Sequence, residues 1–454
     1  MSKEQLLHGW VPAQLGDLGD VITGKTPSTK EPGNFGGDIP FVKPGDLDRG
    51  KYIIKTADTL SEAGFNLIPK LPEKAIMVTC IGNLGKVGIT TRPSSTNQQI
   101  NSVIPLEGVN YKYLYHYLSS MRWWLEQEAS ATTVAIINKG KFSKAPVLLP
   151  PLAEQQEIAA RLDTLLAQVD TLKGRLDALP AILKRFRQSV LAAAVSGKLT
   201  EEWREIKTLS VDNWEHLTFK DVCTEITVGF VGKMADRYQA EGIPFLRSQN
   251  VREFHFSPKN ILYISESFHK EIFKSRLLAG DLAIVRSGAP GTTCVIPGSL
   301  GVANCSDLVI ARPSKRLNSE FGCIYMNSEV AKQNVATNQV GVAQQHFNVG
   351  SMKKMPIHLP SIEEQTEIVR RVEQLFAFAD QVEQRVKDAQ SRVNYLTQSI
   401  LAKAFRGELT ADWRKQHPEL ISGEHSASAL LARIQAERAA QAPAKRTRRK
   451  KASA

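Results

Sequence analysis

One stretch of the chain has the residues and spacing of a phosphate-binding loop. Residues 19–26 read GDVITGKT, which matches the pattern G-x-x-x-x-G-K-[ST]. In such a loop the lysine and the first amides of a following helix bind nucleotide phosphates, so the match predicts a nucleotidase. However, Pro27, Pro32 and Gly33 follow at once and oppose a helix that begins at Lys25. We therefore rank a nucleotidase that uses Gly24-Lys25-Thr26 third among the hypotheses.

No other spacing in the chain is typical of catalysis or metal binding. The nine histidines are scattered, and the sequence has no GxSxG, HExxH or GxGxxG motif and no Asn-Pro-Pro-aromatic tetrapeptide. The cysteines lack CxxC spacing, so we expect small buried side chains rather than metal ligands. They are Cys80, Cys223, Cys294, Cys305 and Cys323. We predict no catalytic residue and no metal site, and the chain is therefore expected to bind rather than to catalyse.

One helical segment occurs twice, and each copy follows a stretch that it would position. Residues 149–204 and 359–414 align without a gap, and both carry apolar residues at alternating steps of four and three. This heptad pattern predicts two long helices that pack as an antiparallel coiled coil. A helix from about Glu154 to Gly197 would span about 65 Å at 1.5 Å per residue and act as a rigid spacer. The seam positions are Ile158, Leu162, Leu165, Val169, Leu172, Leu176, Leu179, Leu183, Phe186 and Val190 in the first copy, and Ile368, Val372, Leu375, Ala379, Val382, Val386, Ala389, Val393, Leu396 and Ile400 in the second.

The two helical copies differ at one position and end alike. Pro180 stands in the first copy where the second has Gln390, and a proline inside a helix removes a hydrogen bond, so we expect a kink or break near Ala178. Both copies close with a glycine, a leucine-threonine pair and a tryptophan-arginine pair, namely residues 197–204 and 407–414. The glycines suit helix stops, and we expect the tryptophans to pack at the helix ends.

The two globular stretches before the helices are diverged copies of each other. Aligning Trp10 with Trp214 brings residues 39–43, IPFVK, onto residues 243–247, IPFLR. Further along, residues 79–85 meet 287–291, and Asn97 is placed on Asn304. The same alignment puts Val228 at Gly24, so the phosphate-loop match is not part of the shared architecture. The framework is shared, while the polar loop contents differ.

Local patterns predict short strands and one helix in each globular stretch. The strand candidates are AIMVTCIG, KVGITT and SVIPL in the first, and DLAIVRS, TTCVI and DLVIARP in the second. Helices are expected around 111–128 and 318–335. The predicted fold is mixed α and β (α+β), with two globular domains, two long antiparallel helices and a pseudo-twofold internal repeat. The expected boundaries are 1–148, 149–206, 207–358, 359–414 and, for a C-terminal helix and basic tail, 415–454.

Charge and hydropathy narrow the class of partner. The formal net charge of +12 includes a run of basic residues near the C-terminus, which is typical of a disordered tail. The remaining positive charge favours a polyanionic partner without requiring one. No segment approaches roughly 18 consecutive apolar residues and the N-terminus has no apolar signal region, so we expect a cytoplasmic protein without a membrane partner. The basic run contains Lys445, Arg446, Arg448, Arg449, Lys450 and Lys451.

The order of these segments resembles a known family. A globular stretch, the segment LPPLAEQQEIAARLD with its GKLTEEWR end, a second globular stretch, and LPSIEEQTEIVRRVE with GELTADWR closely resemble the specificity subunit of type I restriction-modification enzymes over nearly the whole chain. The resemblance implies that each globular domain is a target-recognition domain for one half of a split, asymmetric site on double-stranded DNA. The helices would then act as a ruler for the spacer that is not read.

The resemblance also implies the partners and their cofactors. Two modification subunits would carry S-adenosylmethionine and methylate one adenine in each half-site. Two restriction subunits would use ATP and Mg²⁺ to translocate and cleave DNA. This chain would hold no cofactor and would be the non-catalytic reader. The runner-up is a coiled-coil structural adaptor whose globular domains bind proteins rather than DNA.

Base recognition is expected from Arg, Lys, Asn, Gln and His side chains in the loops, because their donors and acceptors match base edges. Phosphate contacts would position the chain without specifying sequence. The sequence does not reveal the recognised bases or the spacer length. In the first domain the candidates are Lys43, Asn97, Gln98, Gln99, Asn138, Lys139 and Lys141, and in the second they are Arg247, Gln249, Asn250, Arg286, Gln344, Gln345 and His346.

Overall fold

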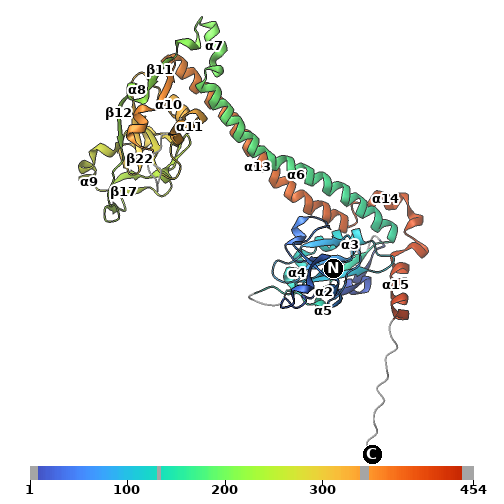
Figure 1. Ribbon diagram of the computed structural model, residues 1–454. Helices are drawn as coiled ribbons and strands as arrows, with labels where there is room; N and C mark the ends of the chain where they lie inside the picture. The colour runs from blue at the N-terminus through green and yellow to red at the C-terminus, as the bar shows by residue number, and fades with distance from the viewer. Residues whose placement is uncertain (1–8, 130–133, 338–346, 442–454) are drawn as a thin grey trace, which may run out of the picture. The chain divides into compact units, whose positions relative to one another are not determined.

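The computed structural model describes residues 9–129, 134–337 and 347–441 and divides into two compact units. Unit 1 takes residues 1–175 and 390–454, and unit 2 takes residues 176–389. Two 44-residue helices, α6 (Leu152–Val195) and α13 (Ile362–Phe405), each contribute to both units (Figure 1). Each unit therefore combines one globular part with a section of both long helices.

Unit 1 is a mixed α and β assembly built on a five-stranded sheet of order β2-β9-β6-β7-β4. A three-stranded sheet, β5-β3-β8, and the antiparallel pair β1-β10 complete the strands. Its elements are β1 (Val11–Gln14), α1 (Leu15–Leu18), β2 (Gly19–Thr23), β3 (Phe35–Val42), β4 (Tyr52–Ile53), β5 (Asp58–Leu60), α2 (Glu62–Asn66), β6 (Ile76–Thr79), β7 (Val87–Thr90), β8 (Ser95–Thr96), β9 (Ile100–Pro105), α3 (Tyr111–Ser119), α4 (Arg122–Glu128), α5 (Lys139–Ser143), β10 (Pro146–Leu149), α14 (Ala411–Gln416) and α15 (Ala427–Gln441).

Unit 2 repeats this plan with a four-stranded sheet, β12-β22-β19-β20, and a five-stranded sheet, β13-β17-β14-β21-β18. The pairs β11-β23 and β15-β16 complete it. Its elements are α7 (Glu201–Ile206), β11 (Glu215–Thr218), α8 (Phe219–Val222), β12 (Cys223–Val228), β13 (Tyr238–Gln239), β14 (Ile243–Leu246), β15 (Val251–Arg252), β16 (His255–Phe256), β17 (Leu262–Ile264), α9 (Glu266–Glu271), β18 (Arg276–Leu277), β19 (Leu282–Val285), β20 (Thr293–Val295), β21 (Ala303–Cys305), β22 (Leu308–Pro313), α10 (Ser319–Met326), α11 (Glu329–Thr337), α12 (Val349–Lys354) and β23 (Pro356–Leu359). The predicted fold class is confirmed.

The predicted helix of each globular part is in fact two helices. In unit 1, α3 ends at Ser119 and α4 begins at Arg122; in unit 2, α10 ends at Met326 and α11 begins at Glu329. At each break a serine hydroxyl donates to a carbonyl of the preceding turn, from Ser120 to Tyr117 at 2.7 Å and from Ser328 to Tyr325 at 2.6 Å. Such side-chain bonds compete with the helical backbone pattern and favour a break.

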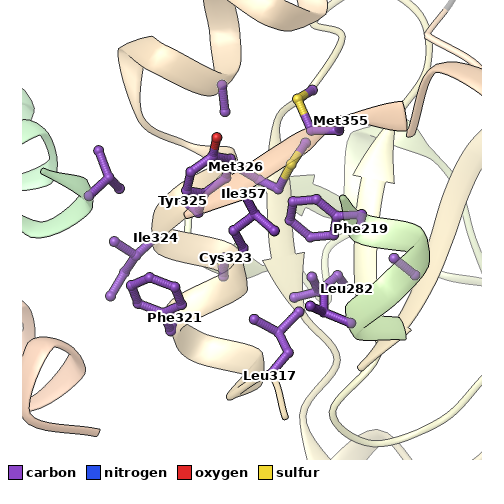
Figure 2. Packing of buried hydrophobic residues seen from close by; sticks show 14 of the residues in the cluster. Phe219, Leu282, Leu317, Phe321, Cys323, Ile324, Tyr325, Met326, Met355 and Ile357 are labelled. Atoms are coloured by element: carbon purple, nitrogen blue, oxygen red, sulfur yellow. The ribbon is translucent and has the colours of Figure 1, made fainter. Parts of the chain in front are cut away.

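The core of unit 2 lies where α10 packs against the sheet and the long helices. Figure 2 shows Phe219 of α8, Leu282 of β19 and Phe321 of α10 in this core. The same buried cluster includes residues of both long helices, such as Val190 of α6 and Ile368 of α13. Burial of this apolar surface fixes α6 and α13 to the globular part.

The long helices are antiparallel within each unit, as predicted. In unit 1, Ile158 near the start of α6 shares a buried cluster with Leu401 near the end of α13. In unit 2 the late α6 residues pack with the first turns of α13. The heptad positions Leu172 and Leu396 are 46% and 43% exposed, so the seam is open at these two positions.

Of the kink or break expected near Ala178, the break is absent, because α6 is continuous from Leu152 to Val195 and contains Pro180. Pro180 lies on the exposed side of the helix. Its ring removes the hydrogen bond to the carbonyl of Leu176, four residues earlier. A carbonyl facing the solvent side can bind water instead, so an exposed proline costs the helix less than a buried one.

Both long helices begin with a buried glutamate that binds the end of the other helical copy. We call the first site junction 1, in which Glu154 accepts hydrogen bonds from Trp10 Nε1 at 2.8 Å and Thr410 Oγ1 at 2.7 Å and pairs with Arg414. In junction 2, Glu364 accepts from Trp214 Nε1 at 3.0 Å and Thr200 Oγ1 at 2.7 Å and pairs with Arg204 at 2.5 Å. The start of each repeat is thus bonded to the end of the other.

At the repeated helix ends Arg204 is buried, whereas Arg414 and the tryptophans Trp203 and Trp413 are partly buried. Arg204 and Arg414 each donate from Nη2 to a glycine carbonyl, Gly197 or Gly407, at 2.6 Å. These glycines have φ values of 78° and 74°, as expected for residues that stop a helix. Trp203 is only partly buried and carries the Lys207 Nζ atom 4.6 Å from its ring centroid.

A cluster of charged side chains ties the globular part of unit 1 to α6. The Asp163 carboxylate on α6 pairs with Lys51, with Lys112 at 3.2 Å, and with His116 Nε2 at 2.7 Å. Burial, together with the two lysine charges, lowers the pKa of His116 to about 4 despite the hydrogen bond to Asp163. Burial raises the pKa of Asp163, but its hydrogen bonds from Lys51 and His116 outweigh this and lower it to about 2.

These pKa shifts predict acid sensitivity of unit 1. Because the folded-state pKa of His116 lies below its unfolded value of about 6.5, the unfolded chain binds the proton more tightly. The contribution of neutral His116 to the unfolding free energy is fully present above about pH 6.5 and is lost as the pH falls through about 4. The loss amounts to about 3 kcal/mol. Asp163 titrates lower, between its usual pKa of 3.8 and about 2.

The measurement is the unfolding free energy of the intact chain in urea from pH 7 to pH 4. His116→Gln should flatten the pH dependence in this window. His425→Gln is a matched control, because His425 is exposed. Equal pH dependence of the unfolding free energy in wild type and His116→Gln would show that His116 does not cause the acid sensitivity.

Candidate nucleic-acid interface

In unit 1 the ends of three strands meet and bring polar loop residues together. The Asn97 amide donates to the Val42 carbonyl at 3.1 Å, which sets the turn after β8 beside Lys43 at the end of β3. The Cys80 amide, just after β6, donates to the Gln99 carbonyl at 2.8 Å. We call this group strand-end cluster 1; it contains Lys43, Cys80, Asn97, Gln98 and Gln99.

Unit 2 has the same backbone arrangement with different side chains. The Ser306 amide donates to the Leu246 carbonyl at 3.0 Å, beside Arg247, and the Arg286 amide donates to the Asp307 carbonyl at 3.4 Å. These bonds match those of Asn97 and Cys80 one for one. Strand-end cluster 2 contains Arg247, Arg286, Ser306 and Asp307.

This matching corrects the sequence alignment. Because Cys80 matches Arg286, residues 79–85 align with 285–291 and not with 287–291. Asn304 pairs with Phe245 just as Ser95 pairs with Phe41, so Asn304 is the counterpart of Ser95 and not of Asn97. The counterpart of Asn97 is Ser306. The alignment was wrong because Phe245 and Asn304 are 59 residues apart, five more than the 54 between Phe41 and Ser95, and the alignment allowed for only three.

The phosphate-loop match is explained by backbone packing. No helix begins at Lys25; the Gly24 amide instead donates to the Ile100 carbonyl at 3.0 Å. A Cβ atom on Gly24 would lie 2.2 Å from the Asn97 carbonyl oxygen, so only glycine fits there. A β-bulge in β12 shifts the register by one residue, which makes Gly229, not Val228, the counterpart.

The polar residues of strand-end cluster 1 differ in how they are engaged. Asn97 is 7% exposed; it donates to Gln99 Oε1 at 2.9 Å and accepts from the Gln99 amide at 3.1 Å, so it shapes the turn. Gln98 is exposed and its Oε1 accepts from Thr26 Oγ1 at 2.8 Å. Lys43 is partly exposed and pairs with Asp58 at 2.7 Å.

The remaining unit 1 candidates lie at the start of α5, next to this cluster. The Ile137 amide donates to the Cys80 carbonyl at 2.8 Å and thereby places Asn138 nearby. Asn138 caps α5 by accepting from the Lys141 amide at 2.9 Å. Lys141 Nζ donates to the Glu128 carbonyl at 2.8 Å, whereas Lys139 is exposed.

In unit 2 one candidate is structural and three are available at the surface. Asn250 is fully buried; it accepts from the Arg247 amide at 3.0 Å and donates to the Ser257 and Lys259 carbonyls. Arg247 and Gln249 both donate to the Asn260 carbonyl, at 3.3 and 3.4 Å. Arg286 is partly exposed. The candidates Gln344, Gln345 and His346 lie outside the described residues.

Chemically, these clusters suit recognition better than catalysis. Burial raises the pKa of the Cys80 thiol to about 11, so this thiol is neutral near pH 7 and a poor nucleophile. Within 9–129, 134–337 and 347–441 no group of three or more His, Cys, Asp or Glu could hold a metal ion. Over the same ranges no helix is long and apolar enough to cross a bilayer. Guanidinium and amide groups at strand ends can instead bind phosphates and base edges.

Sequence reasoning missed several residues of these sites. Thr26 was considered only as part of a phosphate loop, yet it bonds Gln98. Asp307 has a positive φ of 54° and accepts hydrogen bonds from two serines, which the misplaced alignment of Asn304 concealed. The glutamates of the two junctions stand at matching places in the repeated helical motifs, and that recurrence was the signal that could have identified them.

Comparison with known proteins gives one family over both units. A sequence model described as "Type I restriction modification DNA specificity domain" matches residues 8–181 and again 211–389. The EcoKI specificity subunit of Escherichia coli strain K12 is 36% identical over 471 residues, covering 99% of this chain and 100% of that protein. The EcoBI specificity subunit of Escherichia coli is 34% identical over 460 residues, covering 97% and 95%.

Solved structures share the fold at low sequence identity. An HsdS subunit from Thermoanaerobacter tengcongensis matches with a TM-score of 0.60 at 17% identity, covering 89% of this chain and 98% of that one. A chain described as "Structural basis underlying complex assembly and conformational transition of the type I R-M system" matches with a TM-score of 0.66, also at 17% identity, covering 88% and 98%.

Proposed function

Because this chain belongs to the type I restriction-modification DNA specificity family, we propose that it is the subunit that recognises the DNA sequence in such a system, and that it does not itself catalyse a reaction. The observation that carries this proposal is that the family match occurs twice, once over each globular part. Each globular part would contact one half of a bipartite site on double-stranded DNA. The adaptor hypothesis has no support from the EcoBI, EcoKI and StySPI relatives, which are specificity subunits.

The strand-end clusters support recognition of two different half-sites. Their backbone hydrogen bonds correspond, whereas Lys43 is replaced by Arg247 and Cys80 by Arg286. A common backbone with different side chains offers the same docking geometry but a different set of donors and acceptors. Such a pair of readers would recognise an asymmetric site.

Candidates whose side-chain oxygens cap a turn or a helix are poor choices for base contacts. Asn97, Asn138 and Asn250 use their side-chain oxygens to cap turns or a helix. Base recognition would fall to the other described candidates, which are exposed or partly exposed: Lys43, Gln98, Gln99, Lys139, Lys141, Arg247, Gln249 and Arg286.

The internal repeat supports a pair of identical partners. Junction 1 and junction 2 have matching residues and hydrogen bonds. Each unit would therefore present an equivalent structure to a partner chain. We propose two modification subunits, which would bind S-adenosylmethionine and methylate one adenine in each half-site. Two restriction subunits, with ATP and Mg²⁺, would complete the nuclease. The chemistry would reside on these partners, and this chain would act in the cytoplasm by directing them to the site.

The test is methylation mapping of DNA from cells that carry this chain with its modification partner, compared with cells that lack only this chain. We expect a methylated-adenine motif in two short parts with a fixed gap, which disappears completely when the chain is absent. Binding of a duplex with that motif should weaken steeply with salt, because phosphate contacts release counterions. An active, assembled partner that shows no chain-dependent motif would refute the proposal.

A further inference from the structure

The two strand-end clusters differ most in chemistry at one pair of matched positions. Cys80 follows β6 and Arg286 follows β19, and each donates its amide to the carbonyl of a matched loop residue, Gln99 or Asp307. Cys80 is buried at 1% exposure, so it presents no polar group to a ligand. Arg286 places a partly exposed guanidinium side chain at the same point of the fold.

The backbone of Arg286 is held on both sides. Its amide donates to the Asp307 carbonyl at 3.4 Å, and its carbonyl accepts from the Phe347 amide at 3.2 Å. Phe347 is fully buried in the core of unit 2, and Asp307 is held by the hydroxyls of Ser248 and Ser287, each 3.2 Å from its carboxylate. The backbone at Arg286 is therefore fixed, and only its side chain has to be ordered when a ligand binds.

The side chain of Arg286 has no partner among the described residues. Its Nε atom is buried without a hydrogen bond, and no described carboxylate pairs with it. The Asp307 carboxylate, which lies in the same cluster, is bonded instead by the two serines. The other described arginines of the second globular part all have a hydrogen bond, an ion pair or an aromatic ring; they are Arg237, Arg247, Arg252, Arg276, Arg312 and Arg316.

A guanidinium Nε atom that is buried without a hydrogen bond is costly unless a ligand supplies an acceptor. On DNA, the guanine edge offers O6 and N7 in the major groove, which match the two parallel donors of an arginine. We propose that Arg286 recognises a guanine in the half-site read by the second globular part. This inference rests on the proposed function. It also implies that the first half-site has no such contact from the matched position, because Cys80 stands there.

The experiment uses the assembled complex with Arg286→Ala and Arg286→Lys in this chain. Lysine keeps the charge but cannot form two parallel bonds, so both variants should lose discrimination at the same base pair. We expect one guanine of one half-site to become degenerate in the methylation map, with a loss of preference of roughly 5- to 150-fold, and no change in the other half-site.

A binding assay locates the atom that is recognised. Wild type should bind the mapped duplex less tightly when that guanine is replaced by 7-deazaguanine, which lacks the N7 acceptor, whereas Arg286→Ala should not distinguish the two duplexes. Arg252→Lys is the matched control, since Arg252 is exposed and donates to the Val251 carbonyl beside it. This control should leave the motif intact.

The outcomes separate the two levels of the hypothesis. If both Arg286 variants give the wild-type motif, or if they weaken binding equally at all sequences as a phosphate contact would, the guanine contact is wrong while the proposed function stands. A wild-type chain that produces no two-part motif would overturn the proposed function and this inference with it.

Discussion

Glu364→Ala is expected to lower the unfolding free energy of unit 2 by about 3–5 kcal/mol. Glu364 is 3% exposed and binds Thr200, Arg204 and Trp214 in junction 2. Alanine would leave the buried Arg204 guanidinium without its counter-charge, and an unpaired buried charge costs far more than a lost surface pair. The Trp214 indole would also lose its acceptor.

The measurement is urea unfolding of the full chain, combined with hydrogen exchange of peptides that cover 197–204 and 362–372. Glu363→Ala is the matched control. Glu363 is the adjacent residue, but it is exposed and pairs only with Lys207 at 2.9 Å, so its removal should leave stability unchanged within error. Equal stability of the two variants would contradict the role assigned to Glu364.

A double substitution tests whether charge pairing or packing dominates. In Glu364→Leu with Arg204→Met both charges are removed together, so no buried ion is left unpaired. Most of the stability lost in Glu364→Ala should then be recovered, because a buried ion pair often stabilises no more than an apolar pair of similar size. If the double variant does not regain stability, the hydrogen bonds of Glu364 with Thr200 and Trp214 are what stabilise junction 2.

The sequence predicted the repeats but not how they bond to each other. Heptad spacing located both long helices, because burial of a seam requires periodic apolar residues. The junctions escaped detection, since Glu154 and Arg414 are far apart in the sequence and only the fold brings them together. The periodicity also overstated burial, as the exposed Leu172 shows.

Loop positions were harder to predict than strands. The strands around residues 76–105 and 282–313 were found because their apolar runs are buried. The alignment across the loops failed at Asn97 and Asn304, because differences in loop length between the two units carry no sequence pattern. Similarly, the sequence predicted a kink or break near Ala178, but α6 does not break at Pro180. The cost of a proline depends on whether the carbonyl that loses its hydrogen bond can bind water, and the sequence alone does not show which side of the helix is exposed.

Helix α15 has no counterpart among the described residues of unit 2. Helix α15 packs on unit 1, where Leu430 and Ile434 are 1% exposed and belong to the core cluster. Arg438 extends the contact by pairing with Asp20 at 2.8 Å. In unit 2 the strand β11, which matches β1, carries Glu215 in an ion pair with Arg316 at 2.6 Å. A charged pair there does not provide an apolar surface for a helix of this kind.

We therefore expect Leu430→Ala with Ile434→Ala to destabilise unit 1 selectively. Each buried substitution costs about 2–5 kcal/mol where the chain stays docked. The total loss of unfolding free energy cannot exceed the docking free energy of α15, because a helix that has detached makes no contacts that a substitution could weaken. Hydrogen exchange across 427–441 should therefore rise to the rate of an undocked helix, while exchange in unit 2 stays unchanged. Arg433→Ala, at an exposed position of the same helix, should have no effect. Unchanged protection of α15 in the double variant would mean that Arg438 and its neighbours, not the apolar contacts, hold this helix in place.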